Sequence, residues 1–203
     1  MKKLLFAILI AVSLAGCGPA VKRTVSADFE QLAPYRVVVL PVIWESPATA
    51  EADQISNLFR MMSAEKLSAL NYQAVPLDDV ERYSAGQRDW FAGKKPHEIA
   101  APFKADAVLY IRLLDWDTDS LMPYASLKIK AAYEMRSATG KLLWTAEYKS
   151  KEADLSIDKV SMHLTMYKAY EPRVQRFVDA IFTTLPEGRL QEKTRKSYFK
   201  WLP

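Results

Sequence analysis

The chain has 203 residues, and half of them are hydrophobic, which excludes a largely disordered protein. Its formal net charge is +4, of which Lys2 and Lys3 contribute two, so +2 remains on the rest of the chain. This small excess argues against a nucleic-acid-binding protein, and the length suits one domain with a substantial core.

Residues 1–16 have the features of a secretory signal peptide. Lys2 and Lys3 precede an apolar run from Leu4 to Leu14. This run is too short to span a bilayer, since a transmembrane helix needs about 20 apolar residues. The sequence LAGC follows at residues 14–17 and resembles the lipobox of bacterial lipoproteins. The resemblance implies cleavage before Cys17 and attachment to membrane lipid through acyl chains, such as palmitate, on that residue.

The surroundings of Cys17 agree with this interpretation. Cys17 is the only cysteine, so the chain cannot form an internal disulfide. Gly18 stands where many Gram-negative lipoproteins have an aspartate that retains them at the inner membrane. The resemblance therefore implies the outer membrane, with the protein facing the periplasm, and leaves the inner membrane and the cell surface as alternatives. An ordinary signal peptide followed by a chance cysteine is the competing interpretation.

Four segments are expected along the chain. They are a signal peptide at 1–16, a lipidated tether at 17–33, a single α/β domain at 34–186 and a basic, aromatic C-terminal tail at 187–203.

The first half of the domain is expected to alternate strands and helices. The apolar run YRVVVLPV at 35–42 predicts a strand buried on both faces, and Ile43–Thr49 reads as a loop. An apolar stripe at helical spacing predicts a helix over residues 51–70, which Asn71 can end in the left-handed conformation. The Trp90-Phe91 pair is expected to pack as an aromatic plug. The further elements expected in this half are a strand at 72–75 and helices at 77–83 and 96–103.

The second half is expected to form an antiparallel meander closed by a helix. Apolar and polar residues alternate from Tyr124 to Ser137, which predicts a long strand with one wet face. Thr139-Gly140 predicts a hairpin turn after it. The further elements are strands at 107–116 and 141–148, a weak helix at 158–170 and a new helix opened by Pro172. The predicted order is β-α-β-α-β-β-β-α, an α/β (α+β) fold with a mixed sheet and helices packed on it.

Four segments resemble a family of bacterial lipoproteins of unknown function, to which a neisserial vaccine-candidate surface lipoprotein belongs. They are VVVLPVIWESP, NYQAVP, ADAVLYIRLLDWDT and TGKLLW. The resemblance implies a fold like that of the TolB N-terminal domain, CsgG, LpoB and PelC. Those proteins are assembly or auxiliary factors of envelope machines, so the implied role is non-catalytic by analogy alone.

No catalytic motif is evident, and we expect a protein that is not an enzyme and has no cofactor or metal. The two histidines, His97 and His163, have no ligand partner at metal spacing. Asp115, Asp117 and Asp119 would share one face of a continued strand, but the Gly and Glu of an EF-hand loop are missing. A charged strand end leaving the core is the interpretation we adopt for them.

Aromatic residues are the best candidates for binding. Trp44 and Glu45 follow the first strand at its carboxyl end, where open α/β sheets bind ligands. Packing of Trp44 against its own domain is the alternative. Exposed aromatic side chains often mark partner surfaces. Partner contacts are therefore also expected at Trp90, Phe91, Tyr198, Phe199 and Trp201.

Together these features predict a non-catalytic envelope lipoprotein that acts as an assembly or transport auxiliary factor by protein–protein interaction. Two alternatives are a lipid-anchored small-ligand binder or hydrolase using the loop after the first strand, and a ring-forming secretion component. The expected partners are membrane lipid, an envelope protein that the sequence does not identify, and further copies of the chain. Nucleic acid is not expected.

Overall fold

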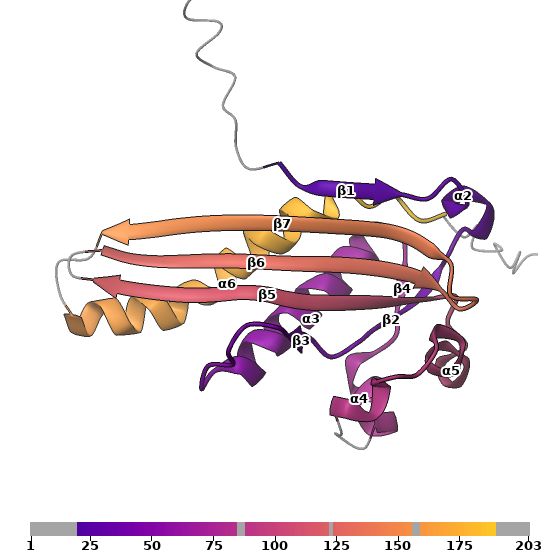
Figure 1. Cartoon of the computed structure of the whole chain (residues 1–203), viewed down its shortest axis with the longest axis horizontal. Helices are drawn as coiled ribbons and strands as arrows, with labels where there is room; N and C mark the ends of the chain where they lie inside the picture. The colour runs from indigo at the N-terminus through magenta and orange to yellow at the C-terminus, as the bar shows by residue number, and fades with distance from the viewer. Residues whose placement is uncertain (1–19, 85–87, 122–123, 156–158, 190–203) are drawn as a thin grey trace, which may run out of the picture.

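The computed structural model of the chain describes residues 20–84, 88–121, 124–155 and 159–189. Seven strands form one mixed sheet with helices packed on it, as predicted (Figure 1). The strand order is β1-β7-β6-β5-β2-β4, and β3 pairs with β5. The strands are β1 (Lys22–Val25), β2 (Arg36–Val39), β3 (Ile43–Trp44), β4 (Gln73–Ala74), β5 (Ala107–Leu121), β6 (Tyr124–Ser137) and β7 (Leu142–Leu155).

The helices expected at 51–70, 77–83 and 96–103 are present close to their predicted positions. The helix expected at 51–70 is α3, and Asn71 after it has a φ of 67°, in the left-handed region as predicted. The α-helices are α2 (Phe29–Leu32), α3 (Ala52–Ala69), α4 (Leu77–Ser84), α5 (Pro96–Ala100) and α6 (Lys159–Phe182). Two 3-10 helices, η1 (Arg88–Phe91) and η2 (Ala101–Phe103), complete the set among the described residues.

Strand β2 lies inside the sheet because it pairs in parallel with both β4 and β5. Its three valines, Val37, Val38 and Val39, have no exposed surface, which confirms the strand buried on both faces. The strand stops before Pro41, which has no N–H to donate to a ladder. The chain then pairs with β5 once more as β3, in the segment expected to be a loop.

The meander of β5, β6 and β7 has one dry and one wet face. One face of β6 carries Leu127, Ile129, Ala131, Tyr133 and Met135, and all five are buried. On the other face Lys128, Lys130, Glu134 and Arg136 are partly exposed, while the small Ala132 is buried. This alternation confirms the predicted wet face. In Figure 1, α3 and α6 lie behind these strands.

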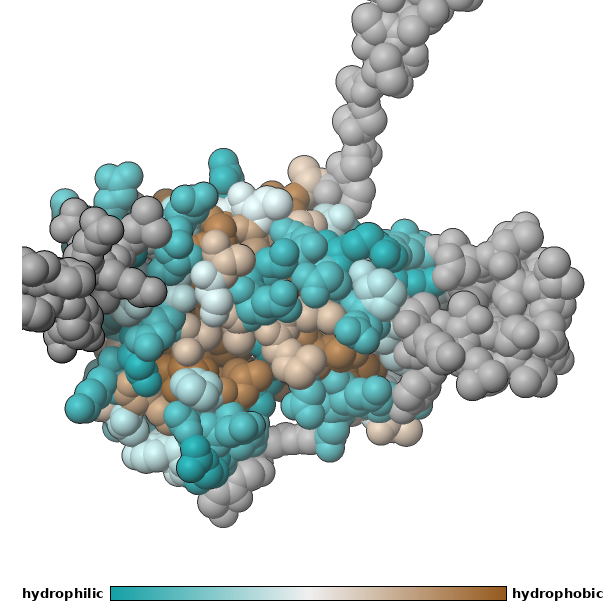
Figure 2. Space-filling model, turned by 180° about the vertical axis from the view of Figure 1, so that it is seen from behind, coloured by the Kyte–Doolittle hydropathy of each residue, from teal (hydrophilic) through white to brown (hydrophobic). Residues whose placement is uncertain are grey.

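Two hydrophobic cores lie on opposite sides of the sheet. The larger core joins β5–β7 to α3 and α6, with Phe59, Trp144 and Phe177 among its members. The smaller core packs α4, η1, α5 and η2 against Val38 and Val108. Seen from behind, the helix side shows a band of hydrophobic surface between hydrophilic borders (Figure 2). In the described part of the chain, the smaller core thus covers the second face of the sheet around β2 and the start of β5.

The domain is longer at both ends than predicted. The expected tether at 17–33 contains β1, which pairs antiparallel with β7, and Phe29, which is buried in the larger core. At the other end, the Gly188 amide donates to the Leu70 carbonyl at 2.8 Å, beyond the expected limit at 186. No hydrophobic periodicity marks β1 in the sequence, because all four of its residues are exposed. The strand is attached to the sheet by backbone hydrogen bonds.

The C-terminal helix also differs from the prediction. Pro172 was expected to open a new helix, but α6 runs through it from Lys159 to Phe182. Both sides of the proline are packed: Tyr170 contacts Trp116 at a ring distance of 5.4 Å, and Val174 is fully buried. Packing on the sheet therefore continues the helix where proline alone would favour a break.

Strands β5 and β7 continue past their predicted ends at Trp116 and Tyr148, as far as Leu121 and Leu155. Charged residues opposite one another support this extension. Asp117 pairs in register with Lys128, and the Lys128 ammonium lies 2.5 Å from the Asp115 carboxylate. Opposite charges across strands stabilise pairing, so the aspartates do not mark the strand end that was expected.

Gly140→Val should lower the free energy of unfolding by about 1–3 kcal/mol, because Gly140 has a φ of 90° in the β6–β7 turn. No atom within 4 Å would meet an added Cβ, so a clash at Cβ does not contribute to the loss. Urea unfolding checks it, with Gly140→Asn as the control that should lose less. Equal stability of Gly140→Val and the parent chain would show that the turn tolerates a branched residue.

Stability should fall as the pH rises above the ordinary tyrosine pKa of 10.0. Burial raises the pKa of the Tyr133 and Tyr72 hydroxyls, so both stay neutral in the folded chain while the unfolded chain loses their protons. The free energy of unfolding then decreases by about 1.4 kcal/mol per pH unit for each tyrosine. Urea unfolding at about pH 9 and about pH 11 should show a smaller drop for Tyr133→Phe than for Tyr83→Phe.

Candidate functional site

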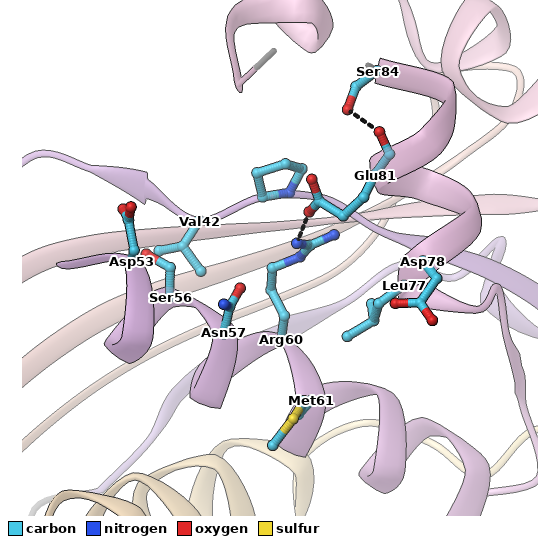
Figure 3. Close-up of a pocket in the computed structure, with 11 residues that line it drawn as sticks. Val42, Asp53, Ser56, Asn57, Arg60, Met61, Leu77, Asp78, Glu81 and Ser84 are labelled. Atoms are coloured by element: carbon cyan, nitrogen blue, oxygen red, sulfur yellow. Dashed lines mark hydrogen bonds and ion pairs between the residues drawn. The ribbon is translucent and has the colours of Figure 1, made fainter. Parts of the chain in front are cut away.

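A pocket of about 450 Å³ lies between α3 and α4, next to the carboxyl end of β2 (Figure 3). Its volume falls within the usual range of small-ligand sites. Its lining comes from the segment after β2 (Pro41, Val42), from α3 (Asp53, Ser56, Asn57, Arg60, Met61) and from α4 (Leu77, Asp78, Glu81, Ser84).

Helix periodicity explains which α3 residues reach the pocket. Ile55, Phe59 and Met62 form the stripe buried against the sheet. Asn57 and Ser56 precede Arg60 by three and four residues, so these three side chains share a neighbouring face of the helix. That face looks toward α4, where Leu77 and Glu81 are likewise four residues apart (Figure 3). The amphipathic pattern that builds the core therefore also builds the pocket.

Arg60 is the most unusual residue of the pocket. It is only 3% exposed, and its Nη1 donates to a Glu81 carboxylate oxygen, as Figure 3 shows. Its Nε and Nη2 are buried and have no hydrogen-bond partner among the described residues. A guanidinium stays protonated, so it cannot escape burial by losing its charge. Unmet buried donors destabilise a fold, and stability alone does not explain this arginine.

Trp44 supports the pocket wall from outside. Its Nε1 donates to the Ser56 hydroxyl at 2.8 Å, and that hydroxyl donates to the Ala52 carbonyl at 2.6 Å. The Trp44 ring lies 6.5 Å from that of Trp116. Trp44 therefore packs against its own domain, which was the alternative interpretation, and it positions one pocket residue.

Glu45 is engaged with the sheet. Its carboxylate lies 3.1 Å from Nη1 of Arg112 on β5, and both side chains are exposed. It is not among the residues that line the pocket. Partner binding by Glu45 stays a prediction.

Trp90 and Phe91 belong to an aromatic cluster on η1. The Trp90 ring lies 4.8 Å from Tyr83 and 4.9 Å from Phe91, and the Lys94 ammonium sits 2.9 Å from its centroid. Phe91 is buried in the smaller core, so it forms the predicted plug and is not a surface contact residue. Tyr83 is 46% exposed, so the cluster reaches the protein surface at this residue. We call Tyr83, Trp90 and Phe91 the η1 aromatic cluster.

The remaining candidate residues lie outside the described part of the chain. These are the lipidation residue Cys17 and the tail residues Tyr198, Phe199 and Trp201.

In the ranges given above, no group of three or more His, Cys, Asp or Glu side chains could hold a metal ion. None of the helices described there combines the length and the hydrophobicity needed to cross a bilayer.

The pocket residues Arg60 and Glu81 were missed in the sequence. Arg60 interrupts the apolar stretch LFRMM at 58–62, where a charge next to the buried stripe is the one signal that could have marked it. Glu81 lies on a different helix, and the sequence carries no sign that the two side chains meet.

The chain has the mixed α/β fold of known lipoprotein structures. Because the sequences are only distantly similar, the comparison shows a shared fold and does not show a shared function. Lipoprotein GNA1162 from Neisseria meningitidis superposes with a TM-score of 0.52 at 21% identity, covering 72% of this chain and 99% of that one. The PelC dodecamer from Paraburkholderia phytofirmans superposes with a TM-score of 0.50 at 13% identity, and the alignment covers 85% of this chain and 100% of that one. No protein-family model and no curated protein matches the chain.

Proposed function

We propose that this chain is a lipid-anchored protein of the bacterial cell envelope that works by binding and not by catalysis. The observation that carries the proposal is the LAGC lipobox at residues 14–17, which precedes a domain with the fold of a solved lipoprotein. Acyl chains on Cys17 would hold the domain at the outer membrane on its periplasmic side. The role is that of an assembly or transport auxiliary factor.

The exposed part of the η1 aromatic cluster, formed by Tyr83 and Trp90, is the proposed contact surface for an envelope protein. Tyr83 and Trp90 offer rigid side chains of large area, which bind partners at a low cost in conformational entropy. Lys94 above the Trp90 ring adds a positive charge at the same place. A partner with an apolar, acidic-rimmed surface would fit this combination.

Self-association is proposed as part of the same function. The PelC structure is that of a dodecamer, and the whole PelC chain aligns with this one. Light scattering of the full chain in detergent tests this point. A molar mass of a single chain at micromolar concentrations would contradict it.

Photo-crosslinking in intact cells tests the contact surface. Benzoylphenylalanine in place of Tyr83 should give a discrete crosslinked product, while the same residue in place of Leu142 serves as the control. Leu142 is exposed to a similar degree, 38% against 46%, but lies outside the η1 aromatic cluster. The Tyr83 product should disappear when Trp90→Ala is added. Identical products from both positions would reject this surface.

A second candidate function is small-ligand binding at the pocket between α3 and α4. The observation that favours it is Arg60, a buried guanidinium with two nitrogens that have no hydrogen-bond partner among the described residues. The pocket adjoins the segment after β2, where ligands bind in open α/β sheets. Anchoring and ligand binding are compatible, since a lipid-anchored domain can present a binding site to the periplasm.

A further inference from the structure

We propose that the pocket between α3 and α4 binds a small amphiphilic monocarboxylate, with its carboxylate on the Nε–Nη2 edge of Arg60. The inference rests on the second candidate function, ligand binding at this pocket, and names the class of ligand.

The donor geometry of Arg60 selects a two-oxygen acceptor. A guanidinium has five N–H donors in a fixed planar fork, and Nη1 of Arg60 already serves Glu81. Nε and Nη2 lie along one edge, where their N–H bonds run side by side. A carboxylate accepts both of these bonds at once. The two nitrogens without a partner are therefore a matched pair and not two unrelated gaps.

The charges of the lining favour a single negative charge on the ligand. Three carboxylates, those of Asp53, Asp78 and Glu81, line the pocket beside one guanidinium. Figure 3 shows Asp53 and Asp78 on opposite sides of the pocket, with Arg60 between them and Glu81 directed at Arg60. One anionic group at Arg60 keeps clear of both aspartates, whereas the second charge of a phosphate monoester would meet a negative wall.

The rest of the lining favours an apolar tail. Val42, Met61 and Leu77 contribute hydrophobic side chains, and Met61 is more than half exposed. Methionine is flexible and adapts to ligands of different shape. Both free nitrogens of Arg60 are covered by neighbouring atoms. The proposal therefore requires lining side chains to change rotamer when the carboxylate binds. A short aliphatic acid combines the single charge with the tail that these residues would cover.

Calorimetric titration with sodium hexanoate tests the proposal, using the full-length protein in lipid nanodiscs and empty nanodiscs as the blank. Hexanoate should bind. Hexanamide, which has the same tail without the charge, should bind with an affinity lower by about tenfold or more. Arg60→Met should abolish hexanoate binding. Arg60→Lys, which keeps the charge but loses the paired donors, should also weaken it about tenfold or more.

Arg82→Met is the matched control, because Arg82 is an exposed arginine of α4 that does not line this pocket. It should bind hexanoate like the parent chain. Inorganic phosphate that binds in place of hexanoate and needs Arg60 would overturn the ligand class and keep the pocket as a binding site. Equal binding of hexanamide would overturn carboxylate recognition. Absence of binding by hexanoate and phosphate alike would overturn both the ligand class and the second candidate function.

Discussion

Trp144→Ala is expected to lower the free energy of unfolding by about 3–5 kcal/mol, the usual cost of removing a fully buried indole. Trp144 has no exposed surface, and its ring lies 6.3 Å from Tyr133 and 5.9 Å from Phe182. Its Nε1 also donates to the Thr184 hydroxyl at 3.2 Å. The substitution removes contacts that join β6, β7 and α6, so the whole larger core should loosen. Urea unfolding followed by circular dichroism measures the loss.

Leu142→Ala is the control for this measurement. Leu142 lies on the same strand, two residues away, and is 38% exposed. Its truncation should cost about 1 kcal/mol or less. If Trp144→Ala also lowered the free energy of unfolding by only about 1 kcal/mol, the indole would not be at the centre of the core.

Glu81→Ala is expected to lower the free energy of unfolding by about 3 kcal/mol, because it leaves the buried Arg60 without its carboxylate partner. Arg60→Met should instead be neutral or stabilising, by up to about 2 kcal/mol, since methionine fills much of the same space without unmet donors. The double variant should resemble Arg60→Met, because the charge that Glu81 compensates is gone. Urea unfolding of the three variants gives the coupling energy.

This double-mutant cycle separates a binding residue from a structural one. If Arg60→Met raises the free energy of unfolding or leaves it unchanged, and also abolishes ligand binding, the arginine serves binding at the expense of stability. A loss of about 3 kcal/mol for Arg60→Met, equal to that of Glu81→Ala, would identify the ion pair as a structural contact. The pocket would then lose the observation that singles it out.

Hydrophobic periodicity was sufficient to predict most of the sheet and its helices. The valines of β2, the alternation along β6 and the stripe of α3 each report burial directly, so these elements were placed within a few residues. Features that depend on distant contacts were not predicted. Strand β1 has no buried residue, and α6 passes through Pro172 because residues on both sides of the proline pack on the core.

The candidate site was predicted less well than the fold. A pocket adjoins the edge after the first strand, where ligand binding was predicted, but Trp44 and Glu45 do not line it and contact their own domain. The pocket depends on Arg60 and Glu81, which are 21 residues apart and on two helices. Their meeting follows from how α3 and α4 are placed around β2, which no local pattern records. The aromatic pair at 90–91 was read correctly as a plug, and Tyr83 was not recognised as its exposed neighbour.

The mass of the N-terminal peptide of the mature protein, isolated from cell membranes, tests the central claim most directly. We predict that this peptide begins at Cys17 and carries the mass of a diacylglyceryl group and an amide-linked acyl chain. Cys17→Ala, examined in parallel, should yield an unprocessed or soluble chain that takes up no labelled palmitate. A mature chain that begins at another residue with an unmodified Cys17, or palmitate on the alanine variant, would contradict lipid anchoring and the envelope function built on it.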